Sequence, residues 1–238
     1  MDQLRGIRGT KRALAFLLLL VFAGIGRAQD VECPLGGYID EATGACTYGI
    51  TIDIAYPDWL SESEAASTAV GTVINEIQTG FLSSLSMMVG PYFSGAYLDI
   101  SYEEFEHGAA LRSIVFTISD YTGGAHGNTY FASVTVDTIA NEPLSLADNI
   151  FVPGADVLAF LQPLVVEQLM ITQGEYADLD WINSGTDGLD DYLAWAINAG
   201  TLELFFPPYQ VAAYAMGSFQ VSIPVDDLAA VINPMLLP

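Results

Sequence analysis

A loop rich in glycine, with aromatic and polar side chains, is the first segment whose residues could take part in chemistry. It reads Tyr-Thr-Gly-Gly-Ala-His-Gly-Asn over residues 121–128. The tyrosine ring could stack on a ligand, the histidine and asparagine could hydrogen-bond to it, and glycines let a backbone approach closely. The candidate binding residues are therefore Tyr121, Gly123, Gly124, His126 and Asn128. The alternative is a tight connection in which His126 caps neighbouring carbonyls, and we favour it because Gly-rich hairpin loops mostly serve geometry.

Catalysis at this loop would need a nucleophile or a metal beside His126. Ser119 and Asp120 lie near it in the sequence, but the chain has no Gly-x-Ser-x-Gly elbow and no pair of histidines at metal-binding spacing. The second histidine, His107, falls in a segment rich in glutamate. We therefore expect no catalytic residue, and a hydrolase that uses His126 with a nearby carboxylate is the alternative.

A second segment, Pro207 to Gly217, carries two tyrosines, Tyr209 and Tyr214, at a spacing that lets their rings pack together. Exposed rings here could stack on sugar rings, so both tyrosines are candidate ligand-binding or partner-binding residues. Core packing is the interpretation that we favour, since large aromatic side chains are mostly buried.

Aspartates gather in a third segment, around Asp178, Asp180 and Asp187. An EF-hand loop would need an oxygen ligand at its fifth position and glycine at its sixth, where this chain has Ile182 and Asn183. We expect a solvated acidic loop, no metal site and no cofactor. An irregular calcium site on these aspartates is the alternative, because hard cations accept mixed oxygen ligands.

Net charge limits the classes of partner. The 238 residues include 29 acidic and 6 basic side chains, and segment 1–28 holds five of the basic residues and one of the acidic ones. The remainder therefore carries 28 acidic residues and one basic residue, Arg112, for a formal charge of −27. Nucleic-acid binding and docking to anionic membranes are excluded, since both need clustered Lys and Arg. Cationic proteins are attracted instead.

The N-terminus resembles a secretory signal peptide. Four basic residues precede an apolar stretch of 13 residues, Ala13 to Ile25, and cleavage is expected after Ala28. An uncleaved anchor is the alternative, although the stretch is shorter than a membrane span requires. We expect an extracytoplasmic protein, periplasmic or secreted, in which Cys33 and Cys46 most simply form a disulfide that closes an N-terminal loop at 29–47.

The elements that position these residues predict an α+β fold, a curved antiparallel sheet with two longer helices packed on it. Helices are expected at 61–88, with an apolar stripe and a capping box of Ser61 and Glu64, and at 155–171, with a kink or break at Pro163. Alternating β-formers predict strands at 47–56, 96–106, 111–120, 128–137 and 219–223, a hairpin at 193–205 and a closing helix at 225–231. With no repeat and no linker, residues 48–238 are expected to form a single domain.

Both motifs, in this order, resemble a known family. The first motif, Tyr-x-Gly-Gly-Ala-His-Gly, follows one strand. The second, Pro-Tyr-x-x-Ala-x-Tyr-Ala-x-Gly, precedes a strand that ends in Ile223-Pro224. Together they resemble the RsiV/PdaC-type extracytoplasmic domain family over about residues 48–233. The resemblance implies an α+β domain with a curved antiparallel sheet. In that family the domain occurs as the sensor of an anti-sigma factor that binds lysozyme, and beside peptidoglycan deacetylase domains.

We therefore expect a secreted or periplasmic, non-catalytic binding domain. Its partner would be peptidoglycan or a lysozyme-like cell-wall hydrolase, and the acidic charge fits a basic protein of the second kind. Two alternatives remain: a hydrolase of wall polymer that uses His126 with a nearby carboxylate, and a structural envelope protein.

Overall fold

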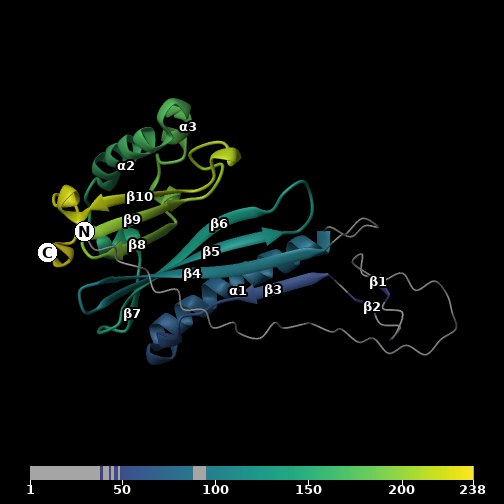
Figure 1. The fold of residues 1–238 in the computed structure, drawn as a ribbon. Coiled ribbons are helices and arrows are strands. Elements are labelled where there is room, and N and C mark those ends of the chain that lie inside the picture. Colours follow the sequence, from purple (N-terminus) through teal and green to yellow (C-terminus); the bar gives the residue numbers. More distant parts are fainter. Residues whose placement is uncertain (1–37, 40–42, 44–45, 48, 88–94, 238) are drawn as a thin grey trace, which may run out of the picture.

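The computed structural model describes residues 38–39, 43, 46–47, 49–87 and 95–237. Its described elements form four layers: a helix, a five-stranded sheet, a three-stranded sheet and a second helix (Figure 1). The predicted α+β class is confirmed. The strands of the predicted sheet divide into a five-stranded and a three-stranded sheet. The expected signal peptide and Cys33 lie outside the described residues, so cleavage and the disulfide stay predictions.

The five-stranded sheet has the order β3-β4-β5-β6-β7. Its strands are β3 (Ile50–Ile54), β4 (Ala96–His107), β5 (Leu111–Tyr121), β6 (Asn128–Asp137) and β7 (Glu142–Leu144). β3 runs parallel to β4, and the other neighbours are antiparallel. The parallel pair corrects the all-antiparallel expectation. The long helix between β3 and β4 makes it possible, because parallel neighbours need a long crossover connection.

Helix α1 (Glu64–Met87) covers one face of this sheet (Figure 1). The predicted apolar stripe is confirmed, since Val70, Ile74, Phe81 and Leu85 are buried. The start of the helix differs from the expected capping box, because the Ser63 hydroxyl accepts from the Ala66 N–H (3.2 Å). Residues 58–62 form a 3₁₀ turn instead of the first turn of α1.

The three-stranded antiparallel sheet has the order β10-β9-β8, with β8 (Ala194–Asn198), β9 (Thr201–Phe206) and β10 (Phe219–Pro224). Helix α2 (Val157–Gln173) packs on its outer face through side chains at four-residue spacing, and it continues through Pro163. Among the described residues, Val157–Tyr176 is long and apolar enough to cross a membrane by length and composition. Here Val157, Leu161, Val165 and Leu169 belong to the core beside β8–β10.

The smaller elements correct several local expectations. The turn expected near Asn141 leads into strand β7, and the expected acidic loop contains helix α3 (Leu179–Ser184). The closing helix is only a 3₁₀ turn, Val225–Leu228. Strands β1 (Tyr38–Ile39) and β2 (Cys46–Thr47) pair with each other before β3.

Strand β8 lies across the five-stranded sheet on the face opposite α1, and side chains of that sheet satisfy its outer edge. The Ser133 hydroxyl accepts from the Trp195 N–H (3.0 Å), and the Ser113 hydroxyl accepts from the Ile197 N–H (3.2 Å). At the hairpin, His107 Nδ1 accepts from the Gly200 N–H (3.0 Å). Unpaired backbone groups at a buried edge are costly, so these side chains determine where the second sheet rests. His107 therefore has a structural role.

Candidate functional site

The two motif segments meet in space. Residues 121–128 connect β5 to β6, and residues 207–217 lie between β9 and β10. The rings of His126 and Tyr214 stack with centroids 4.1 Å apart and planes inclined by 27°. The Tyr214 hydroxyl also donates to the Gly127 carbonyl (2.9 Å). A contact between residues 88 positions apart in the sequence thus joins the two loops.

Two more aromatic residues adjoin this stacked pair, Tyr209 through its ring and Trp181 through a hydrogen bond to the Tyr209 backbone. The Tyr209 ring lies 5.3 Å from that of Tyr214, and Trp181 on α3 donates its indole N–H to the Tyr209 carbonyl (3.0 Å). Tyr209 is 56% exposed and Trp181 36% exposed. His126, Tyr214, Tyr209 and Trp181 together are called the ring cluster below. Tyr209 was expected to pack in the core, but its ring is exposed. Its backbone has a positive φ of 73° at the tip of the loop.

Tyr121 and Asn128 brace the Gly-rich loop from within. The Tyr121 hydroxyl donates to the Gly124 carbonyl (3.0 Å), and its ring stacks on Tyr97 at 6.0 Å. The Asn128 amide donates to the Asp120 carboxylate (3.0 Å). These bonds use the polar groups of Tyr121 and Asn128 inside the loop. They support the expected structural role of the loop and leave His126 as its exposed ring.

Close packing explains the glycines of this loop. A Cβ on Gly127 would lie 2.7 Å from the Tyr97 hydroxyl oxygen and 2.8 Å from the Asp120 carbonyl oxygen, closer than a real Cβ contact. Gly123 and Gly124 have φ values of 122° and 100°, a region that side chains with a Cβ rarely enter. The predicted candidates Gly123 and Gly124 thus shape the turn. Gly127, which was not among the candidates, lets Tyr97 and the β5 backbone approach.

The His126 side chain has one assigned hydrogen bond. Its Nδ1 lies 2.8 Å from the Gly127 carbonyl, which can only accept, so Nδ1 carries the proton in this contact. This capping of a neighbouring carbonyl is the expected role. The nearby carboxylate, Asp120, accepts from Asn128 instead of from the imidazole. In a neutral ring of this tautomer, Nε2 is left as an acceptor.

The segment that carries Trp181 is rich in aspartate. The Asp178 carboxylate caps α3 by accepting from the N–H groups of Asp180 and Trp181 (both 3.1 Å). Asp191 is tied to the tyrosine segment because its carbonyl accepts from the Gln210 side-chain amide (2.7 Å). The basic Arg112 lies at the far end of β5, where it pairs with Glu106 (3.5 Å). The segments of Trp181, Tyr209 and Tyr214, residues 174–193 and 207–217, thus contain acidic residues and no Lys or Arg.

The calcium alternative gains no support from this geometry. Within the parts of the chain that the structure describes, no three Asp, Glu, His or Cys side chains come together to hold a metal ion. Asp178 instead serves as the N-cap of α3. The expectation of no metal at Asp178, Asp180 and Asp187 stays a prediction, with calcium as its alternative.

Trp181 is the member of the ring cluster that sequence reasoning missed. Asp178 followed by Leu179, Asp180 and Trp181 has the pattern of an N-cap before a short helix. The density of aspartates favoured a loop, and one turn of helix leaves little periodicity to detect. The N-cap pattern was the available signal.

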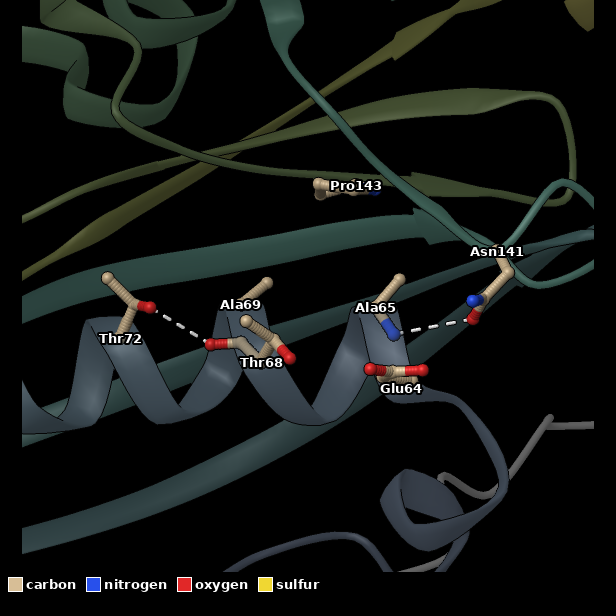
Figure 2. A pocket seen from close by; sticks show the side chains of 7 residues that line it. All are labelled: Glu64, Ala65, Thr68, Ala69, Thr72, Asn141 and Pro143. Atoms are coloured by element: carbon tan, nitrogen blue, oxygen red, sulfur yellow. Dashed lines mark hydrogen bonds between the residues drawn. The ribbon is translucent and has the colours of Figure 1, made fainter.

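A groove of about 580 Å³ lies elsewhere, between the start of α1 and β7 (Figure 2). Small side chains of α1 line it, and Asn141 and Pro143 form its other side. The Asn141 amide oxygen accepts from the Ala65 N–H (3.3 Å) and the Ser63 hydroxyl (3.0 Å). These bonds hold the helix start against the edge strand, so the groove is a structural seam between α1 and β7.

Comparison with known proteins supports the family resemblance. Residues 148–226 match the family described as "Protein of unknown function (DUF3298)". The chain is 31% identical over 127 residues to the peptidoglycan-N-acetylmuramic acid deacetylase PdaC of Bacillus subtilis, covering 53% of this chain and 27% of PdaC. It is 25% identical over 183 residues to the esterase Rv3036c of Mycobacterium tuberculosis, covering 74% of this chain and 73% of the esterase.

Two solved structures share the fold. A DUF3298 family protein of Pseudomonas aeruginosa has a TM-score of 0.56 at 22% identity, covering 79% of this chain and 87% of that one. A DUF3298 family member of Bacteroides fragilis has a TM-score of 0.53 at 20% identity, covering 83% of this chain and 89% of that one.

The resemblance to the RsiV/PdaC-type domain family is therefore confirmed, and the chain carries a DUF3298 segment related to PdaC. The chain spans only about a quarter of the length of PdaC. The DUF3298 segment contains Trp181, Tyr209 and Tyr214, whereas His126 precedes it. The ring cluster thus joins the matched segment to the five-stranded sheet.

Proposed function

We propose that this protein is an extracytoplasmic binding domain that holds a basic, lysozyme-like cell-wall hydrolase against its ring cluster. The observation that carries this proposal is the exposed Tyr209 ring, which is backed by Tyr214 and His126 and is bonded through its carbonyl to Trp181 of the aspartate-rich segment 174–193. The relation to a peptidoglycan deacetylase supports a place at the cell wall.

Aromatic side chains with rigid support make effective binding anchors. Tyr and Trp are over-represented among the few residues that dominate interface energetics. Tyr209 loses little freedom on binding, because its carbonyl is held by Trp181 and its ring rests on Tyr214. Preorganisation of this kind lowers the entropic cost of association.

Charge favours a cationic protein over an anionic polymer as the partner. The chain after residue 28 has 28 acidic residues and one basic residue. Such a surface attracts a basic protein and raises the association rate at low salt. A wall polymer that carries free carboxylates or phosphates would be repelled, so peptidoglycan is the second candidate partner.

Calorimetric titration of the purified chain with a c-type lysozyme, at low and at moderate salt, tests the proposal. We expect saturable binding that survives moderate salt and weakens about 30-fold or more in Tyr209→Ala, the loss typical of an interface anchor. Alanine keeps the Cβ, so the positive φ at position 209 gains no new strain. Tyr56→Ala is the matched control, since Tyr56 is 40% exposed and follows β3, away from both loops.

A basic protein of similar charge, without a lysozyme fold, runs beside these titrations. Equal binding of that protein, or loss of all binding at moderate salt, would reduce the interaction to bulk charge. Binding of purified peptidoglycan by the chain, with none of lysozyme, would move the wall polymer ahead. A structural envelope protein would bind neither.

A hydrolase is the second candidate, because one relative is named an esterase and the Nε2 of His126 is left as a proton acceptor. Hydrolysis of p-nitrophenyl acetate by the chain, abolished in His126→Ala while circular dichroism stays unchanged, would favour the enzyme. A rate equal to that of the variant would oppose it.

A further inference from the structure

A crevice opens where the two sheets diverge, on the face of the five-stranded sheet opposite α1. Its volume is about 220 Å³, below the range of pockets that hold drug-sized ligands. The residues that give it its chemistry are Glu103, Val115, Phe131, Phe205, Phe219 and Gln220. A crevice of this size suits a fragment of a few heavy atoms.

Aromatic rings make much of its wall. The Phe205 ring lies 5.7 Å from Phe131 and 5.8 Å from Phe105, and both pairs are tilted. Phe205 and Phe219 are almost fully buried, and Phe131 is half-buried. Such rings pack against alkyl groups, and their faces attract cations.

One carboxylate lines the crevice, and a second is hydrogen-bonded to one of its lining residues. Glu103 on β4 lines the crevice and is exposed. Glu203 on β9 is only 5% exposed and lies behind Gln220, whose side-chain amide donates to Glu203 Oε2 (3.0 Å). The Ser222 hydroxyl donates to the same oxygen (2.5 Å). Both of these donors are neutral.

A buried carboxylate is costly unless a cation compensates it. The one basic residue after position 28, Arg112, pairs with Glu106 and stacks over Trp59 at 5.0 Å, and Trp59 packs against the core on the α1 side of the sheet. Within the residues that the structure describes, no Lys or Arg lies at the crevice, so an incoming cation would meet Glu103 beside aromatic walls, with Glu203 behind Gln220.

We propose that this crevice binds a primary alkylammonium group. The ammonium would sit at Glu103, with Gln220 and Glu203 behind it, and the alkyl stem would pack on Phe131 and Phe205. A free amine and the side chain of a lysine on another protein share this chemistry. The inference does not depend on lysozyme binding, because a small amine tests it directly.

Chemical-shift titration of the ¹⁵N-labelled chain with n-butylamine at pH 7 is the experiment, with n-butanol and butyrate as matched probes. We expect saturable shifts at Val115, Phe131 and Gln220 with a dissociation constant of about 1–10 mM, the range for so small a ligand. Butanol and butyrate should give no saturable shifts there. Equal binding of butanol, or no saturation by the amine, would overturn the proposal.

Substitutions locate the charge requirement. Glu203→Gln keeps the size of the side chain and should weaken the amine about tenfold or more, while Glu103→Gln should weaken it a few-fold, since water screens an exposed charge. Glu76→Gln, on the exposed side of α1, is the matched control and should change nothing. If Glu203→Gln unfolds the chain, the site is still tested by Glu103→Gln and by the comparison of butylamine with butanol and butyrate. Unchanged affinity in Glu103→Gln and Glu203→Gln would refute the site.

N-acetyl-lysine methylamide distinguishes the two sources of the amine. Saturation by both this compound and butylamine supports a lysine side chain of a partner protein. Saturation by butylamine alone supports a free amine, because the crevice would then exclude the peptide backbone.

Discussion

The two faces of the five-stranded sheet differ in what they hold. The face under α1 is an ordinary apolar core in which Ile114, Phe116 and Ile118 are fully buried. The opposite face alternates with it along the same strand and carries Ser113, Val115 and Thr117. That face is mixed, with hydroxyl groups and an apolar cluster of Val115 and Phe131; part of it holds the second sheet, and the rest lies near the crevice and the Gly-rich loop.

The two faces of this one strand therefore contribute to the structure in different ways. Apolar residues on the α1 face stabilise the fold through the hydrophobic effect, which does not depend on the direction of a contact. Hydroxyl groups on the other face supply bonds of defined geometry, which place β8 and leave polar surface uncovered beyond it. Strand alternation allows both functions because neighbouring side chains point to opposite faces.

The largest expected effect is on the α1 face. Phe116→Ala should lower the free energy of unfolding by about 3–5 kcal/mol, because it removes a fully buried ring and leaves a cavity. Urea unfolding followed by circular dichroism measures it. Phe131→Ala is the matched change on the opposite face and should cost less than half as much, since Phe131 is half-buried beside a crevice. Equal costs would break the comparison.

A smaller effect is expected from the hydroxyl that places β8. Ser113→Ala should cost about 1–3 kcal/mol, because the buried Ile197 N–H loses its acceptor and Thr135 loses its partner at 2.9 Å. The same urea titration applies. Ser101→Ala lies on an exposed part of the same face and should change stability by no more than about 0.5 kcal/mol. A Ser113→Ala variant as stable as Ser101→Ala would show that β8 is held by apolar packing alone.

The smallest effect is a dependence on alkaline pH that belongs to the α1 face. Burial, helped by the negative charge of Asp120, raises the pKa of Tyr130 from 10 to about 12. The folded state thus keeps the phenol proton that the unfolded state loses. The stability contributed by neutral Tyr130 is complete below pH 10 and is lost as the pH rises towards 12. Unfolding titrations between pH 8 and pH 11.5 measure the decline.

Tyr130→Phe is the control for this dependence. Its stability should fall less steeply above pH 10, because a group that titrates differently in the two states is gone. Absorbance at 295 nm should show one late-titrating tyrosine fewer. The residual slope belongs in part to Tyr192, whose pKa is also raised by burial. Identical slopes for the chain and the variant would contradict the assignment.

The sequence determined those helices and strands whose apolar residues recur regularly and whose ends are marked by turn residues. Alternation of apolar and polar residues placed β4, β5 and β6 to within a few residues, and the apolar stripe at helical spacing did the same for α1. The acidic charge predicts that neither nucleic acid nor an anionic membrane is a partner. The two motifs were visible in the sequence because glycine, proline and tyrosine at fixed spacing are local features.

Only the tertiary structure decided how these parts combine. Alternation shows that a strand has two faces but does not say which neighbour it pairs with, so the parallel β3–β4 pair and the separate second sheet were not predictable from it. Tyr209 was expected in the core but is exposed, at a backbone position of positive φ beside the ring of Tyr214. The ring cluster itself depends on the docking of one sheet on the other. That docking depends on long-range contacts such as Ser113 to Ile197, which no local pattern encodes.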